Sequence, residues 1–527
     1  ITYGTNTKAD RGFACQISFG YEPLGVSSRP IVLGPVKGSM DKRIASITTS
    51  ANSQIYRKYV LSYDTSSDLG HTQFARLKSI VVSNGTGQSM PPVRVDWNVM
   101  PSADVSDKET DWPTDKSTKL FEEESKSFLA CDLNNDGISD IVRISQVGVY
   151  DYVSSKTYNK HQETWLFANL SDREDGSFDQ RSLRLPDQVS FANIQGHMTS
   201  LSAVDVDGDG YNDLVLPYFI EDGHSKDLCF YVVFGKEFAR GRGKCHPVLG
   251  YQVYKDCSSP LMATGNFSGN GKSELFSMSD AQESDGTYQA CMMTHISDSA
   301  FSAATFSLTM PEKPRKIFTG DYNSDGLVDL LFTSDNKYTI FYNQGGTETD
   351  RKFSDQNKCT GVELTDKWRL AQGDFDGDGR IDFVYPDGRD LNIAFNQGNG
   401  GFRIAKQVAT LDLGDGKSTK DNDKYTLLAL DQDGDGKSDV FACNAYYEYH
   451  GFPEWKYSFN RGCATWLYST GSTLVPYKQV RINREEDLRQ DRIFLGDFDG
   501  NGILEVANCG GSLSGAKASS EESIHVY

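Results

Sequence analysis

The stretch LSAVDVDGDGYNDLVLPYF, residues 201–219, places four aspartates within nine residues, at positions 205, 207, 209 and 213. Four carboxylates this close repel one another unless a cation lies among them. Oxygen ligands at loop positions 1, 3, 5 and 9, with a backbone carbonyl at position 7, form the kind of set that Ca²⁺ takes. Apolar strand formers flank the loop, so we predict a calcium loop between two strands. The alternative is a polar hairpin turn without metal.

This stretch begins like an EF-hand but continues differently. An EF-hand needs a glutamate at position 12 and a helix on each side. Position 12 is Leu216, and Pro217 follows it in a segment that a helix would not accept. Gly208 and Gly210 allow the tight turn of the loop. The sequence therefore predicts a strand–loop–strand unit.

The same nine-residue frame occurs seven times, with starts separated by 53 to 73 residues. We number these frames loop 1 to loop 7 by their first residues, which are Asp132, Asp205, Asn266, Asp321, Asp374, Asp431 and Asp497. A short apolar run precedes and follows each loop, and each unit has room for about four short strands. Repeats of this length and composition predict an all-β, seven-bladed calcium-binding β-propeller. A helical solenoid is excluded because no unit shows a sustained helical apolar period.

The predicted calcium ligands are the residues at positions 1, 3, 5, 7 and 9 of six loops, with position 7 acting through its backbone carbonyl. They are Asp132, Asn134, Asp136, Ile138 and Asp140; Asp205, Asp207, Asp209, Tyr211 and Asp213; Asp321, Asn323, Asp325, Leu327 and Asp329; Asp374, Asp376, Asp378, Arg380 and Asp382; Asp431, Asp433, Asp435, Lys437 and Asp439; and Asp497, Asp499, Asn501, Ile503 and Glu505. Loops 1, 4 and 7 carry three carboxylates each and are expected to bind with intermediate strength. Loop 3 supplies one carboxylate, from Glu274, and is expected to be weak or empty.

Residues 1–100 lack the acidic frame. Five long strand-like segments, at 14–22, 43–50, 56–64, 76–84 and 93–99, are separated by turn residues. One face of the segment 56–64 is apolar, which predicts a half-covered antiparallel sheet. Residues 101–117 are polar, contain two prolines and are predicted to be a linker. The predicted propeller covers residues 118–527.

Composition narrows the function classes. The chain has 53 Lys and Arg against 73 Asp and Glu, a formal net charge of −20, which argues against a nucleic-acid partner. No run of 18 or more apolar residues occurs, so no membrane span is expected. Calcium sites of moderate affinity fill in extracellular fluid, which favours a secreted location. The first residues, ITYGTNTKAD, are no signal peptide, so the chain is expected to be a fragment of a longer one.

The sequence contains no recognisable set of catalytic residues. The sequence contains no H-E-x-x-H, G-x-S-x-G or G-x-x-x-x-G-K-[ST] motif, so we expect no enzymatic activity. One interpretation pairs Cys443 with Cys463 in a disulfide, because the two cysteines flank two aromatic runs that could be hairpin partners, and the alternative is that they do not pair. The aromatic segments 444–459 and 462–469 suit sugar stacking, with a strand-rich blade edge as the favoured alternative.

The segment QGDFDGDGRIDFVY (372–385) resembles the FG-GAP or VCBS repeat. Such repeats form the calcium-dependent propellers of integrin alpha subunits and of many secreted bacterial proteins. The resemblance implies this fold and calcium ligands at positions 1, 3, 5 and 9 of the matching loops. It covers residues from about 118 to the end.

The strands ISFGYE, MDKRIASI, YRKYVLSYD, RLKSIVVS and PPVRVDWNV, followed by these repeats, resemble the B component of insecticidal toxin complexes. They are similar more broadly to the plasmid-virulence-protein-B-like region of Rhs toxins. Val95 stands where that family has an aromatic residue, and Trp97 is retained. The resemblance implies a shell that encloses a toxic cargo and a propeller that docks on the pore-forming component. That family is expected to have six blades, whereas seven loops predict seven here.

Three function classes remain open. The first is a structural and docking module of a toxin assembly, with a pore-forming component or a cell-surface receptor as its protein partner. The second is an extracellular adhesin or lectin that binds glycans through the propeller. The third is an accessory domain of an enzyme whose catalytic part lies elsewhere.

The last unit is predicted to be incomplete. Two strand-like segments follow loop 7, so the seventh blade is expected to have about three strands. An open sheet edge favours further pairing. We expect the segment 117–124 to supply the missing strand.

Overall fold

The computed structural model describes residues 2–3, 15–24, 29–33, 36–52, 54–64, 76–95, 125–154, 157–171, 178–187, 189, 201–221, 226–241, 245–247, 260–297, 300–345, 353–364, 369–411, 425–432, 435–450, 456–482, 493–498, 504–510 and 523–526. Strands dominate these residues, and α1 (Gly235–Ala239) is the single α-helix among them. The all-β prediction is confirmed. No helix in these ranges has the length and apolarity that a membrane crossing requires.

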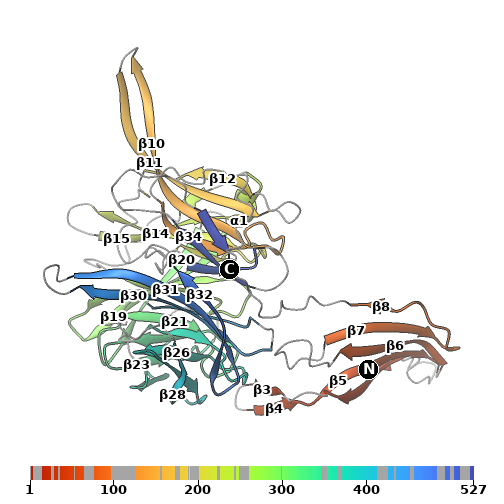
Figure 1. The fold of residues 1–527 in the computed structure, drawn as a ribbon. Coiled ribbons are helices and arrows are strands. Elements are labelled where there is room, and N and C mark those ends of the chain that lie inside the picture. Colours follow the sequence, from red (N-terminus) through yellow and green to blue (C-terminus); the bar gives the residue numbers. More distant parts are fainter. Residues whose placement is uncertain are drawn as a thin grey trace.

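The N-terminal region forms one six-stranded antiparallel sheet in the order β1-β2-β5-β6-β7-β8 (Figure 1). Its strands are β1 (Thr2–Tyr3), β2 (Cys15–Pro23), β5 (Lys42–Ala51), β6 (Gln54–Asp64), β7 (Arg76–Asn84) and β8 (Val93–Arg94). A hairpin of β3 (Arg29–Leu33) and β4 (Val36–Met40) forms a second, two-stranded sheet. The predicted strands correspond closely to β2, β5, β6 and β7, but most of the predicted strand 93–99 lies outside the described residues.

Seven antiparallel sheets follow among the described residues, and we number them sheet 1 to sheet 7 in chain order. Sheet 1 contains β9 (Ser125–Cys131), β10 (Asp140–Ser154), β11 (Thr157–Ser171) and β12 (Phe178–Arg184). Sheet 2 contains β13 (Ser202–Val204), β14 (Asp213–Glu221), β15 (Lys226–Val233) and β16 (Cys245–Pro247). Sheet 3 contains β17 (Leu261–Gly265), β18 (Glu274–Gln282), β19 (Thr287–Ser297) and β20 (Ala300–Thr309).

Sheet 4 contains β21 (Lys316–Gly320), β22 (Asp329–Thr333), β23 (Tyr338–Phe341) and β24 (Lys358–Gly361). Sheet 5 contains β25 (Ala371–Gly373), β26 (Asp382–Asp387), β27 (Asp390–Asn396) and β28 (Phe402–Thr410). Sheet 6 contains β29 (Tyr425–Leu430), β30 (Asp439–His450), β31 (Lys456–Ser469) and β32 (Leu474–Ile482). Sheet 7 contains β33 (Ile493–Gly496), β34 (Glu505–Gly510) and β35 (Ser523–Val526), the three strands expected of the last unit.

Successive sheets touch through their first strands, as in a β-propeller. β9 contacts β13, β13 contacts β17 and β17 contacts β21, and β25 contacts β29. β33 of sheet 7 contacts β9 of sheet 1, so the last sheet lies beside the first. The segments 101–117 and 117–124, predicted as linker and closing strand, lie outside the described residues.

The hydrophobic core lies between neighbouring sheets. One cluster joins Phe276 and Met292 of sheet 3 to Leu330 and Phe332 of sheet 4. Another joins Val142 of sheet 1 to residues of sheet 2. A single sheet has two apolar faces here, and stacking it between two neighbours covers both. The apolar runs that flank each loop supply these faces.

Two long hairpins occur in sheets 1 and 6, and Figure 1 shows β10 and β11 extending well beyond the rest of sheet 1. The aromatic segment 444–459 contributes to β30 and β31, which agrees with the strand interpretation. In this hairpin Cys443 lies opposite Ala464, and Cys463 lies opposite Asn444. The structure gives Cys443 no disulfide, so the proposed pairing is wrong.

Candidate functional site

Each acidic loop joins the first and second strands of its sheet, and position 9 is the first residue of the second strand in all seven sheets. In loop 4, Asp321 accepts hydrogen bonds from the N–H groups of Asp325 (3.0 Å) and Gly326 (2.8 Å). Asp325 in turn accepts from the N–H of Leu327 (2.9 Å). Loops 1, 2 and 5 repeat this pattern. The carboxylates at positions 1 and 5 therefore shape the turn.

Left-handed backbone at positions 4 and 6 turns the chain. Gly326 at position 6 of loop 4 has a φ of 87°, and Ser324 at position 4 has a φ of 62°. A glycine accepts this conformation without strain, whereas other residues adopt it rarely. Position 6 is glycine in every loop, and its φ is positive in the six loops where the structure describes it.

The turns bring several predicted ligands together. In loop 2 and in loop 5, three carboxylates offer oxygen atoms that all lie within 4.8 Å of one another: Asp205, Asp207 and Asp209, and Asp374, Asp376 and Asp382. These are oxygen-only groups of the type that hard cations bind. Burial and the neighbouring charges of Asp378 and Asp374 raise the pKa of Asp376 to about 6. A divalent cation would relieve this repulsion, so the residues fit calcium.

Position 9 has a second role that the sequence reasoning missed. Asp382 is 1 % exposed, and its carboxylate accepts hydrogen bonds from the N–H groups of Phe375 (3.0 Å) and Asn396 (2.7 Å). It thus connects the start of the loop to the end of the third strand. The equivalent bonds are made by Asp140, Asp213, Asp329 and Asp439. Position 9 carries a carboxylate in every loop while positions 3 and 5 vary, and this was the available signal.

Burial dominates the electrostatics of position 9. It raises the pKa of Asp140, Asp213 and Asp329 to about 7 and that of Asp382 to about 8. Nearby loop carboxylates raise these values further, whereas the backbone N–H donors lower them. A buried negative charge is costly without a nearby cation.

Some predicted ligands cannot be placed. Asp433, Asp499, Asn501 and Ile503 lie outside the described residues, and for Glu505 only the strand position is described. Loop 3 is fully described. Its one carboxylate, Glu274, accepts from the N–H of Ser268 (3.1 Å) and from the Ser268 hydroxyl, so protein donors engage both oxygens.

The residue at position 8 donates its backbone N–H to the preceding loop in loops 1, 3 and 6. Ser139 of loop 1 donates its N–H to the carbonyl oxygen of Asp497 in loop 7 (2.7 Å), and its hydroxyl oxygen accepts from the Asp497 N–H (2.9 Å). A Cβ added to Gly496 would lie 2.7 Å from the Ser139 Cβ. Gly373 meets Ser438 in the same way between sheets 5 and 6. The glycine before position 1 is therefore needed for close contact between sheets.

We expect Gly496→Val to lower the free energy of unfolding by about 1–3 kcal/mol, because the new side chain overfills the contact between sheets 7 and 1. Urea denaturation measures the change. Gly496→Ala combined with Ser139→Gly should recover part of the loss of Gly496→Ala, since it removes the group that the new Cβ meets. Full stability of Gly496→Val would show that the two sheets do not meet at this point.

The N-terminal sheet has one apolar face. The register aligns Phe19, Ile47, Tyr59 and Val82 in one row across β2, β5, β6 and β7. Ser18, Thr48, Lys58 and Ser83 form the adjacent row, whose side chains face the other side.

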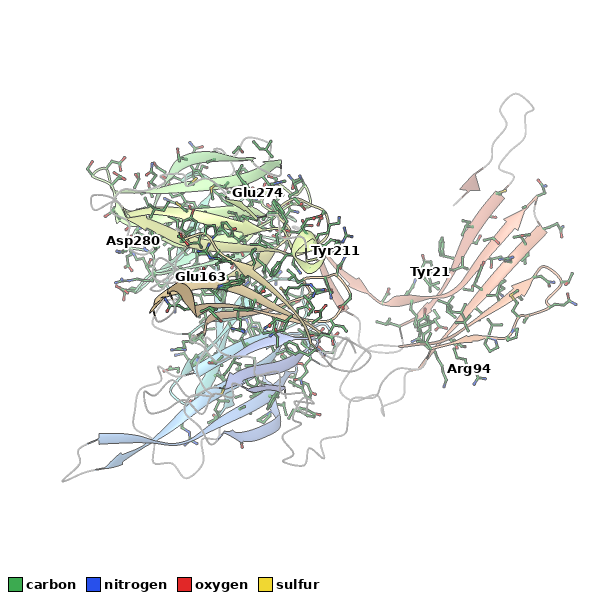
Figure 2. The ribbon with its side chains drawn as sticks, turned by 90° about the horizontal axis from the view of Figure 1, so that it is seen from above. Tyr21, Arg94, Glu163, Tyr211, Glu274 and Asp280 are labelled. Carbon is green, nitrogen blue, oxygen red and sulfur yellow. The ribbon has the colours of Figure 1, made fainter. Side chains whose placement is uncertain are left out.

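The apolar row is only partly covered, because Ile47, Tyr59 and Val82 are half-buried whereas Phe19 is exposed. Phe19 is 38 % exposed, and at the sheet edge Val93 is 58 % exposed. No described side chain before residue 125 is fully buried. Tyr21 and Arg94, labelled in Figure 2, mark this sheet. A partly exposed apolar face of this kind is typical of an interaction surface.

Comparison with known proteins gives a family for part of the chain. The FG-GAP-like repeat matches residues 321–385 and 374–442. These segments contain loops 4, 5 and 6. The chain contains FG-GAP-like repeats. A search of the curated proteins found no match.

Similar solved structures include an Agrocybe aegerita lectin described as recognising non-reducing terminal N-acetylglucosamine, at 14% identity and a TM-score of 0.38, covering 77% of this chain and 88% of the lectin. TcdB2-TccC3 is similar at 13% identity and a TM-score of 0.27, covering 99% of this chain and 26% of that chain. The NanB sialidase from Streptococcus pneumoniae is similar at 9% identity and a TM-score of 0.26, covering 92% of this chain and 65% of the sialidase. All three TM-scores are too low to define a shared function.

Proposed function

We propose that the chain is a non-enzymatic, extracellular docking module in which a closed, seven-bladed and calcium-stabilised propeller accompanies a sheet that packs against a protein partner. The partly exposed apolar face of the N-terminal sheet, with Phe19 and Val93 exposed, carries this proposal. A sheet is stable in water when something covers its hydrophobic face. Phe19 and Val93 remain exposed on this face, so a protein surface outside the described residues is expected to cover them.

The assembly we propose is a toxin complex of the Rhs type. The support is the resemblance of the strands in residues 14–100 and of the repeats that follow them. In this assembly the sheet belongs to a shell, and the propeller meets a pore-forming component. The contacts between β33 and β9 support ring closure, because they place the last sheet beside the first.

Binding to a pore-forming toxin component tests the proposal. We expect saturable binding in biolayer interferometry with calcium present. Phe19→Ser/Val93→Ser should reduce the apolar dye binding of the isolated chain, since both side chains are exposed. Ser18→Ala on the opposite face is the control. Unchanged dye binding in the double variant together with no binding to the pore-forming component would refute the docking role.

Glycan binding is the second candidate. The register of β30 and β31 pairs the backbone position of Tyr447 with that of Phe459 and the position of Tyr449 with that of Tyr457. Aromatic rings stack on sugars through their apolar faces. A glycan array distinguishes the two functions, because a lectin should bind a defined glycan and lose binding in Tyr449→Ala/Tyr457→Ala.

A further inference from the structure

The position-5 carboxylate has a protein partner on the same oxygen in all five loops where the structure describes it. In loops 1 and 4, position 3 is asparagine. There the amide nitrogen donates to the position-5 Oδ2, from Asn134 to Asp136 (3.0 Å) and from Asn323 to Asp325 (2.9 Å). Each of these loops has three carboxylates.

Loops 2, 5 and 6 have aspartate at position 3 and therefore four carboxylates each. An aspartate cannot donate this bond when ionised. In these loops a basic side chain pairs with the position-5 Oδ2 instead: Lys236 with Asp209 (3.0 Å), Arg380 with Asp378, and Lys437 with Asp435. The added positive charge accompanies the added negative charge in each case.

The basic side chains come from different places. Arg380 and Lys437 occupy position 7 of their own loops. Position 7 of loop 2 is Tyr211, and the cation there comes from α1, where the Lys236 ammonium lies 5.1 Å from the centre of the Tyr211 ring. Figure 2 shows Tyr211 beside this helix. The ion pair with the position-5 carboxylate is thus made either by position 7 of the loop or by α1. This indicates that the four-aspartate loops require the ion pair, whichever residue supplies it.

We propose that Lys236, Arg380 and Lys437 are resident counter-ions of the four-aspartate loops. Each neutralises the extra aspartate when the loop holds no metal, and each competes with calcium for the position-5 oxygen. The competition rests on the calcium binding proposed above. The number of carboxylates alone therefore does not rank the affinities of the loops.

The three counter-ions differ in how firmly they are held. The Lys236 side chain is 35% exposed and can move into solvent. The Arg380 side chain is 8% exposed, and its Nε also donates to the carbonyl oxygen of Asn396 (2.9 Å). Calcium should consequently displace Lys236 more readily than Arg380, so loop 2 should bind calcium more tightly than loop 5.

Hydrogen exchange of the peptide spanning residues 201–221, measured by mass spectrometry on the full chain, tests this for loop 2. In that loop the N–H groups of Gly208, Asp209 and Gly210 donate to Asp205 and report on its closure. In chelator, Lys236→Gln should speed their exchange about fivefold, because repulsion among four aspartates is no longer balanced. In a calcium titration, the amides of this peptide in Lys236→Gln should become protected from exchange at a calcium concentration about fivefold lower than in the wild type.

Two variants provide controls. Asp207→Asn/Lys236→Gln gives loop 2 the pattern of loops 1 and 4 and should exchange like the wild type in chelator. Lys272 belongs to loop 3, and its aliphatic side chain lies against Gly208 of loop 2. Among the described residues it forms no recorded ion pair with a loop carboxylate, so Lys272→Gln should have a smaller effect.

The outcomes separate the two proposals. Wild-type exchange that does not respond to calcium would refute calcium binding in loop 2, and the chelator arm would still test the counter-ion. Equal exchange of the wild type and Lys236→Gln in chelator would overturn the counter-ion proposal. Equal effects of Lys236→Gln and Lys272→Gln on exchange in chelator would also overturn it. The same holds if Asp207→Asn/Lys236→Gln exchanges as fast as Lys236→Gln.

Discussion

Asp382→Ala is expected to lower the free energy of unfolding by about 3–5 kcal/mol, with or without calcium, because it removes the acceptor of two buried backbone N–H groups. Those groups belong to Phe375 and Asn396. Phe375 lies at the start of the loop, and Asn396 lies at the end of the third strand. Each buried donor left without an acceptor costs about 1–3 kcal/mol. Urea denaturation in chelator and in calcium measures the loss under both conditions.

Two other variants test the reason for this loss. Asp382→Asn keeps one carbonyl oxygen as an acceptor and should lose less than Asp382→Ala. Asp376→Ala removes a carboxylate of the same loop that takes no part in the connection between loop and strand, so in chelator it should be nearly neutral. A loss for Asp382→Ala that appears only in calcium would show that position 9 acts solely as a ligand.

The sequence predicts most of the architecture because each repeat carries its own signal. The seven frames lie between the first and second strands of seven sheets, and the strand-like segment 76–84 coincides with β7. Apolar alternation and fixed turn glycines encode such local features directly. Three strands in the last sheet could also be expected from the few strand-like segments after loop 7.

Contacts between distant residues were not predictable in the same way. The pairing of Lys236 with Asp209 joins residues 27 positions apart and depends on where α1 follows β15. The contact of Gly496 with Ser139 joins the two ends of the repeat array. The register of β30 and β31 sets which residues lie opposite Cys443 and Cys463 in the hairpin, and sequence spacing alone did not give that register. Tertiary structure, not local pattern, sets each of these.

Position 9 has a structural role that the predicted ligand set did not include. The structure distinguishes the carboxylates of a loop by what they hold in place. Positions 1 and 5 shape the turn, and the buried position-9 carboxylate connects the loop to its sheet. The loop frame is therefore a folding element as well as a candidate metal site.

Calcium removal is expected to lower the melting temperature by about 10 °C or more, and added calcium should restore it. A ligand that binds the folded state alone stabilises that state, by about 2.7 kcal/mol per site at a hundredfold excess over Kd. Six loops with three or four carboxylates each would contribute, although the protein donors already present in each loop reduce the gain. Scanning calorimetry in chelator and in calcium measures the shift.

Each loop should contribute its own part of this stabilisation by calcium. Asp376→Ala should remove the contribution of loop 5 and loosen sheet 5 more than distant sheets, because each sheet contacts mainly its neighbours. In a calcium-loaded crystal structure, ions should lie 2.3–2.6 Å from oxygen in loops 2, 5 and 6, whereas loop 3, with Glu274 engaged by Ser268, should hold none. An unchanged melting temperature in excess chelator, together with no metal by elemental analysis, would leave the loops as polar turns held by their own hydrogen bonds. Their repeated Asp–backbone bonds would then be sufficient to explain the acidic frame.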